Sequence, residues 1–183
     1  MLEKYLIEHC APTLASIKTA NLFCFEPSQE AVLAKQLDNW NRRLKEKGVF
    51  LTVLGRCKGR ALIYVCRGAR LQNDLKKPGV ADFLSAYGYS GGELGCILER
   101  LRERLGETGS FPHEIGLFLG YPLKDVEGFI RNQGRNCKCA GCWKVYGDAS
   151  EAIRTFARFQ KCREVYARLW REGRSVWQLT VAA

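Results

Sequence analysis

Short strand-like segments alternate irregularly with helical patterns along this chain of 183 residues, and that irregular order constrains the fold most. Hydrophobic, β-rich runs cover residues 18–25, 49–54, 61–66 and 143–146. Helical patterns lie between these runs, but no strand–helix–strand unit recurs at a regular period. The sequence therefore predicts one α+β (or α/β) domain over residues 1–183. We expect a small mixed sheet of about four to five strands, flanked by helices.

The longest predicted helix covers residues 149–172 and is amphipathic. Its apolar residues recur at the three- and four-residue spacing of one helix face. They are Ala152, Phe156, Phe159, Tyr166 and Trp170. We expect this face to pack on the domain, with Phe156, Phe159 and Trp170 largely buried, and the basic residues to lie on the opposite face.

Two local signals predict where elements begin and turn. A polar link with two glycines, residues 55–60, joins the runs 49–54 and 61–66 and predicts a β-hairpin. Ser90 and Glu93 have the spacing of a capping box, in which each side chain bonds the backbone of the other residue. We therefore expect a helix to begin at this box.

The chain is strongly basic, with 29 Lys and Arg against 19 Asp and Glu and a net charge of +10. Residues 131–174 hold 11 basic and 4 acidic residues, so this segment carries +7 of that charge. Such a field attracts anionic partners. The candidate anion-binding residues on the long helix are Arg154, Arg158, Lys161 and Arg168. Nucleic acid is a less favoured partner, because Glu151, Glu164 and Glu172 lie beside these cations and a polymer-binding groove needs a larger footprint.

No membrane or export segment is visible in the sequence. The longest run without a charged residue, residues 83–92, is too short to cross a bilayer. The first ten residues lack the basic and apolar regions of a signal peptide. Nine cysteines, an odd number, fit a reducing cytoplasm better than a disulfide framework. We expect Cys24, Cys57, Cys66 and Cys96 to be small core residues.

The strongest chemical signal is a cysteine-rich loop over residues 136–147. Cys137, Cys139 and Cys142 lie within six residues, and Cys162 on the following helix supplies a fourth thiol. Four thiolates suit zinc or an iron–sulfur cluster. Nearby lysines and arginines favour the thiolate, which also promotes redox reactivity. The sequence leaves open a metal site, a dithiol switch and an unreactive packing loop.

A second constellation pairs Cys10 with His113. Cys10 precedes Ala-Pro-Thr and is expected just before or at a helix start, where the helix dipole lowers a thiol pKa. A cysteine so placed and a histidine on a later segment are the parts of a papain-like hydrolase or acyl transferase. Asp125 or Asn132 is the candidate residue to orient the imidazole. The competing interpretation is a buried Cys10 and a helix-capping His113.

Four phrases of the sequence carry a resemblance: HCAPTLASIKTANLF (9–23), FPHEIGLFLGYPLKDVEGFI (111–130), NCKCAGCWKVYGD (136–148) and KCREVYARL (161–169). Together they resemble an uncharacterised family of cytoplasmic proteins from anaerobic Gram-positive bacteria, classified as a domain of unknown function. The resemblance covers nearly the whole chain. It implies a stand-alone protein, sometimes encoded beside flavodoxins, and hence a link to redox or iron physiology. It implies no activity, so the mechanism must come from the residues.

The sequence as a whole favours a cytoplasmic cysteine-cluster protein without a membrane partner. In this interpretation four thiols bind zinc or an iron–sulfur cluster, or act as a thiol redox switch with a redox partner protein. They belong to Cys137, Cys139, Cys142 and Cys162. The first alternative is a thiol enzyme that uses Cys10, His113 and Asp125. The second is an anion-binding or nucleic-acid-binding module that uses the basic helix face.

Overall fold

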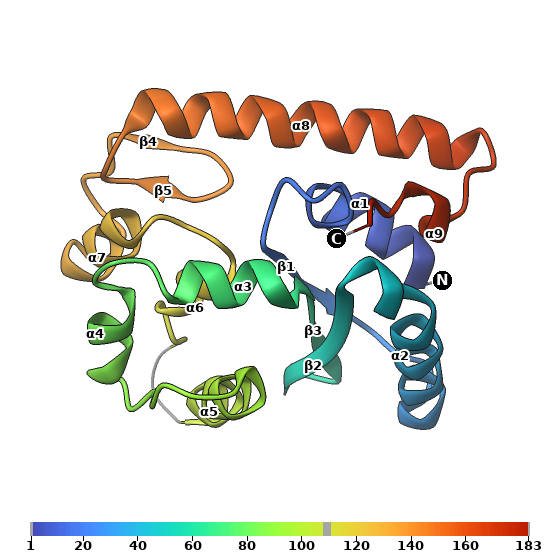
Figure 1. The fold of residues 1–183 in the computed structure, drawn as a ribbon, viewed down its shortest axis with the longest axis horizontal. Coiled ribbons are helices and arrows are strands. Elements are labelled where there is room, and N and C mark those ends of the chain that lie inside the picture. The colour runs from blue at the N-terminus through green and yellow to red at the C-terminus, as the bar shows by residue number, and fades with distance from the viewer. Residues whose placement is uncertain (1, 108–110, 183) are drawn as a thin grey trace.

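The computed structural model describes residues 2–107 and 111–182, and its elements form an α+β fold (Figure 1). The strands are β1 (Ala20–Phe25), β2 (Val49–Cys57), β3 (Arg60–Arg67), β4 (Cys139–Ala140) and β5 (Lys144–Val145). The helices are α1 (Leu2–Leu14), α2 (Glu30–Leu44), the 3-10 helix η1 (Lys45–Lys47), α3 (Gly68–Leu75), α4 (Val80–Ser85), α5 (Leu94–Gly106), α6 (Ile115–Phe118), α7 (Leu123–Arg131), α8 (Ala149–Arg171) and α9 (Val176–Leu179).

The strands form two separate antiparallel sheets. The larger sheet has the order β1-β3-β2, and β4 pairs only with β5. The predicted hairpin is confirmed, since β2 and β3 are antiparallel neighbours joined at Lys58 and Gly59, both with positive φ. The α+β class is confirmed as well. The expected sheet is divided because the β4–β5 segment lies beside α7 and α8 instead of joining the β1-β3-β2 edge.

Each face of the larger sheet carries its own hydrophobic core. Alternate residues of β3 point to opposite faces, as the two-residue period of a strand requires. On one face, Ile63 and Val65 pack with α1, α2 and α9. On the other face, Tyr64 and Cys66 pack with the five helices α3 to α7. The sheet is therefore covered by helices on both sides, which explains why its central strand is almost entirely buried.

The buried guanidinium of Arg67, at the end of β3, joins three distant parts of the chain. It donates hydrogen bonds to the carbonyl oxygens of Thr13, Leu14, Lys47 and Val181, at 2.6 to 3.1 Å. Thr13 and Leu14 end α1, Lys47 ends η1, and Val181 follows α9. Because a buried charge needs such partners, Arg67 fixes the end of α1 next to the chain segment that follows α9.

Helix α8 is the longest element, and its predicted extent is confirmed to within one residue. Asp148 caps it by accepting a hydrogen bond from the Glu151 N–H at 3.0 Å. In Figure 1 its first half passes over the β4–β5 hairpin and its second half over α1. Phe159 is buried as expected, while Phe156 and Trp170 are half-buried. In residues 2–107 and 111–182 no helix has the length and apolarity that a bilayer span requires.

Three smaller expectations are corrected by the structure. Helix α5 begins after Glu93 without any side-chain cap, so the predicted capping box of Ser90 and Glu93 does not form. Cys66 is buried as expected, but Cys24 and Cys96 are exposed. The side chain of Cys57 lies outside the described part of the structure.

Candidate functional site

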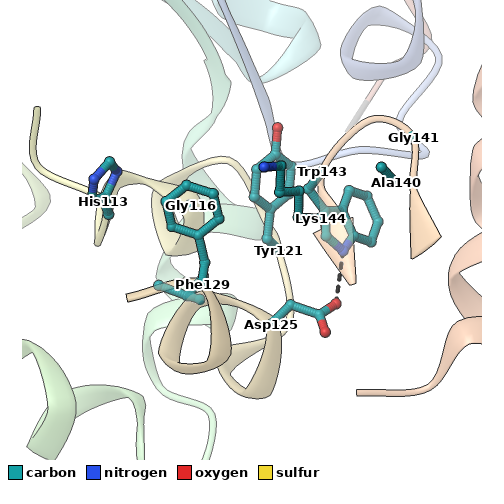
Figure 2. Close-up of a pocket in the computed structure, with 10 residues that line it drawn as sticks. His113, Gly116, Tyr121, Asp125, Phe129, Ala140, Gly141, Trp143 and Lys144 are labelled. Carbon is teal, nitrogen blue, oxygen red and sulfur yellow. Dashed lines mark hydrogen bonds between the residues drawn. The ribbon is translucent and has the colours of Figure 1, made fainter. Parts of the chain in front are cut away.

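The cysteine-rich loop is organised by one buried carboxylate, Asp125, in the first turn of α7. Only 3% of Asp125 is exposed. It accepts a hydrogen bond from the Trp143 indole N–H at 2.7 Å (Figure 2). It also accepts hydrogen bonds from the backbone N–H groups of Tyr146 and Gly147 at 2.8 and 2.7 Å. Trp143 directly precedes β5, and Tyr146 and Gly147 follow it. Asp125 therefore holds the hairpin on α7, and no hydrogen bond joins it to His113 among the described residues.

Two glycines permit the hairpin to pack this closely. A Cβ atom on Gly128 of α7 would lie 2.4 Å from the Tyr146 side chain, and one on Gly141 would lie 2.3 Å from the Phe156 ring. Contacts this short exclude a Cβ atom at either position unless the facing aromatic side chain or the backbone moves. The hairpin is thus wedged between α7 and α8, and Trp143 packs edge-on against Phe156 with ring centroids 4.5 Å apart.

The lysines of the cysteine-rich loop bind backbone oxygen atoms. Lys138 Nζ donates to the Gly147 carbonyl at 2.6 Å, and Lys144 Nζ donates to the Gly134 carbonyl at 2.7 Å. These hydrogen bonds stabilise the conformation of the loop. The cation in contact with a thiol comes instead from α8, where Arg163 Nη2 lies 3.3 Å from Cys142 Sγ.

The four candidate metal ligands occupy different positions around the hairpin. Cys139 lies on β4 opposite Val145, and Cys142 lies in the turn that follows β4. Cys137 precedes β4, and Cys162 lies on α8, where burial raises the pKa of its thiol to about 11. All four are free and half-buried. Within the described ranges, no three His, Cys, Asp or Glu side chains form a group that could hold a metal ion.

A buried lysine that the sequence interpretation missed lies next to Cys142. Lys18, just before β1, is only 7% exposed, and burial lowers the pKa of its ammonium group to about 8. Among its neighbours, the thiols of Cys10 and Cys142 raise this pKa and Arg163 lowers it. Lys18 Nζ lies 5.4 Å from the centre of the Tyr121 ring. A lysine at the beginning of a buried strand was the available signal in the sequence.

Lys18, Cys142 and Arg163 line one cavity, which we call the thiol cleft. Its volume is about 420 Å³, and it lies where the α1–β1 corner, the hairpin and α8 meet. The remaining lining residues are Glu8, His9, Asn21, Leu22, Tyr121, Gly141, Phe156, Phe159 and Gln160. The structure therefore brings together a thiol, a guanidinium and an ammonium from three segments that are distant in sequence.

A second, mainly aromatic pocket is lined by residues of α7 and of the hairpin (Figure 2). It measures about 350 Å³, and its walls include His113, Tyr121, Phe129 and Trp143. Tyr121 and Trp143 are stacked with centroids 4.8 Å apart, and the His113 ring meets Phe129 at 4.8 Å. His113 is thus part of an aromatic wall, and Asp125 lines the same pocket through its contact with Trp143.

The environment of Cys10 differs from the expected one. Cys10 lies in the second half of α1, where the positive end of the helix dipole has no effect on it. It is fully buried in the core that α1, α2 and α9 share with the sheet, and burial raises the pKa of its thiol strongly. A thiol so placed has no open path to a substrate. The expected helix-start position and lowered pKa are both wrong.

The basic face of α8 is partly neutralised by its own acidic residues. Arg154 forms an ion pair with Glu151, and Arg168 forms one with Glu172, at 2.8 and 3.2 Å. Lys161 is exposed, and Arg158 lines a separate cavity of about 490 Å³ beside α7. This arrangement fits a solvated helix face, and anion binding by these four residues stays a prediction.

The fold and the site define an α+β protein with a cysteine-bearing hairpin clamped between two helices. The chain belongs to the family described as Protein of unknown function (DUF3793), whose model matches residues 6–180. No curated protein and no solved structure shows a significant match. The expected membership in a family of unknown function is confirmed, and the chemistry must be argued from the thiol cleft.

Proposed function

We propose that this protein is a thiol-dependent redox protein of the cytoplasm and that Cys142 is its reactive thiol. The observation that carries the proposal is the 3.3 Å contact between Arg163 Nη2 and Cys142 Sγ at the edge of the thiol cleft. The thiolate is the nucleophilic form of cysteine, and neighbouring cations favour it. Reactive cysteines accordingly lie in partly exposed, electropositive surroundings, whereas buried cysteines such as Cys10 are inert.

The reaction that suits this site is thiol–disulfide exchange. The Cys142 thiolate attacks one sulfur of a low-molecular-weight disulfide, so a new sulfur–sulfur bond forms while the original one breaks. The departing thiolate takes a proton from water. A dithiol partner protein then reduces the mixed disulfide: its first thiol attacks the ligand's sulfur and displaces Cys142 as a thiolate, and its second thiol displaces the remaining small thiol and so completes the partner's own disulfide. Cys142 returns to its starting state, and the partner is oxidised by two electrons.

Thiol exchange suits the hairpin better than a static metal site does. A tetrahedral zinc site needs four ligands at about 2.0–2.3 Å from one ion. The described residues contain no group of even three candidate ligands so arranged, and Cys142 faces a cation that would repel a metal ion.

The test is the alkylation rate of each cysteine with iodoacetamide, located by fragmentation mass spectrometry. We expect Cys142 to react faster than the exposed Cys24 and Cys96. The variant Arg163→Gln should slow Cys142 by about tenfold, because a hydrogen bond to a charged group is worth about 1.5 kcal/mol. Arg168→Gln, which removes the same charge farther along α8, should leave the rate within about twofold.

Two results would overturn the proposal. One is a Cys142 that reacts no faster than Cys24 and is indifferent to Arg163→Gln. The other is stoichiometric zinc or iron, bound through these thiols in protein purified without oxygen, which would restore the metal-site interpretation.

A further inference from the structure

We propose that the thiol cleft is an oxyanion site, in which Lys18 and Arg163 bind a carboxylate or phosphate group carried by the small disulfide that reacts with Cys142. This inference deepens the proposed function, on which it rests for the identity of the substrate. Binding of the oxyanion itself does not require the thiol. The two ideas can therefore fail separately.

The Lys18 ammonium forms neither a hydrogen bond nor an ion pair with the described residues. Its Nζ lies 5.4 Å from the centre of the Tyr121 ring. Charged groups this deeply buried are ordinarily paired, because leaving water is unfavourable for them. A cation–π contact replaces only part of the lost hydration. Lys18 is thus a buried cation that lacks an anion.

The Lys18 ammonium reaches a cavity. In the described chain, no fully enclosed side-chain nitrogen or oxygen lacks a hydrogen-bond partner. Since Lys18 Nζ makes no such bond, it cannot be sealed in protein, and it must reach one of the cavities that Lys18 lines. Its titratable neighbours are Cys10, Cys142 and Arg163, of which Cys10 is buried in the core while Cys142 and Arg163 line the thiol cleft. Lys18 therefore shares the thiol cleft with Cys142 and Arg163.

The charges that line the thiol cleft favour an anion. Its only carboxylate among the described lining residues is that of Glu8, and Lys4 already lies 3.7 Å from it. Arg163 contacts Cys142 through one nitrogen, which leaves further guanidinium N–H groups free to donate. Lys18 and Arg163 repel each other, as the effect of Arg163 on Lys18 shows. An oxyanion between them would relieve that repulsion and accept hydrogen bonds from both.

The neighbouring cavity of about 490 Å³ is a weaker candidate, although Lys18 also lines it. Its walls carry four carboxylates, from Asp74, Asp125, Asp148 and Glu151, beside five cations, Lys18, Arg70, Lys77, Lys124 and Arg158. These cations therefore already have acidic neighbours in the same cavity, and no cysteine lines it among the described residues. The thiol cleft combines the favourable charge with a volume of about 420 Å³, which lies in the range of small-molecule sites. Tyr121 and Phe156 add two aromatic walls for the apolar part of the ligand.

The first experiment compares two disulfides that differ in charge. The anionic probe is 5,5′-dithiobis(2-nitrobenzoate), and the neutral probe is 4,4′-dithiodipyridine. The rate of mixed-disulfide formation at Cys142 is measured for each probe and located by fragmentation mass spectrometry. We expect the wild-type protein to favour the anionic probe and Lys18→Met to reduce the anionic-to-neutral rate ratio about tenfold, as loss of one charge-assisted hydrogen bond implies. Lys18→Arg should keep most of the preference.

Lys35→Met is the matched control, because it removes an exposed lysine of α2 that does not line the cleft. It should leave the rate ratio within about twofold. If Lys18→Met fails to fold, competition by phosphate in the wild-type protein still tests the oxyanion site. Inorganic phosphate should slow the anionic probe at Cys142 more than the neutral one. A wild-type protein that shows neither charge preference nor phosphate competition overturns the oxyanion site.

The second experiment separates this inference from the proposed function. Isothermal titration calorimetry measures binding of inorganic phosphate and of glutarate to Cys142→Ser, which has no thiol to react. We expect at least one of these oxyanions to bind, and the better one identifies the source of the negative charge. Binding that persists in Lys18→Met overturns the inference, as does absence of binding for both. If an oxyanion binds but Cys142 of the wild-type protein proves unreactive toward disulfides, the oxyanion site is supported and the exchange function is refuted.

Discussion

Replacement of Asp125 by asparagine should loosen the cysteine hairpin without changing the shape of the side chain. The carboxylate accepts three hydrogen bonds, two at Oδ1 from backbone N–H groups and one at Oδ2 from the Trp143 indole. An asparagine oriented to keep the backbone bonds turns its NH₂ group toward the indole N–H, so two donors face each other. The opposite orientation keeps the indole bond and loses both backbone bonds.

The size of the effect follows from these contacts. A hydrogen bond to a charged group contributes about 1.5 to 3 kcal/mol, and a neutral one about half as much. Asp125→Asn loses one charged bond outright and weakens two others. Because such terms are not additive, we expect the free energy of unfolding to fall by about 2 to 4 kcal/mol. Asp38→Asn is the control: its partner Arg42 lies 3.1 Å away on the exposed surface of α2, so the loss should stay below about 1 kcal/mol.

Two measurements together test this reasoning. Urea unfolding reports the global free energy, and hydrogen exchange of the Tyr146 and Gly147 amides reports local opening of the hairpin. The second is needed because β4 and β5 pair only with each other and could open while the larger sheet stays folded. The argument fails if Asp125→Asn unfolds within about 0.5 kcal/mol of wild type and both amides keep their wild-type exchange rates.

Two further predictions concern the contact of the hairpin with α8 and the buried lysine. Gly141→Ala should lower the free energy of unfolding by about 1 to 3 kcal/mol in urea, because its Cβ would lie 2.3 Å from the Phe156 ring, whereas Gly91→Ala, with no atom within 4 Å, should have little effect. Equal effects of the two substitutions would contradict this. Lys18→Met should stabilise the protein most below pH 8, where wild type must keep a charged ammonium buried. This advantage should shrink as the pH rises from about 8 toward 10.5, since the unfolded wild-type chain then binds more protons than the folded one; a stability difference that is constant with pH would refute it.

Local patterns predicted the elements whose boundaries depend on neighbouring residues. The apolar spacing of Ala152, Phe156 and Phe159 predicted α8, since a helix with one apolar face is recognisable from its own sequence. The glycine-containing link between residues 49–54 and 61–66 predicted the β2–β3 hairpin for the same reason. The Ser90 capping box failed because its spacing is also compatible with an extended approach to α5, and Glu93 occupies the cap position instead.

The sequence by itself predicted a mixed α+β or α/β fold and the long amphipathic helix, and it indicated the cysteine-rich loop as a candidate site. Only the tertiary structure decided which cysteine meets a cation and which other groups share its cavity. Lys18, Cys142 and Arg163 come from a corner, a hairpin turn and a helix, and no periodicity along the chain relates them. Packing of α8 across α1 and the hairpin brings them together. Local propensity acts over a few residues, whereas this site depends on burial of distant apolar surfaces, which one sequence does not reveal.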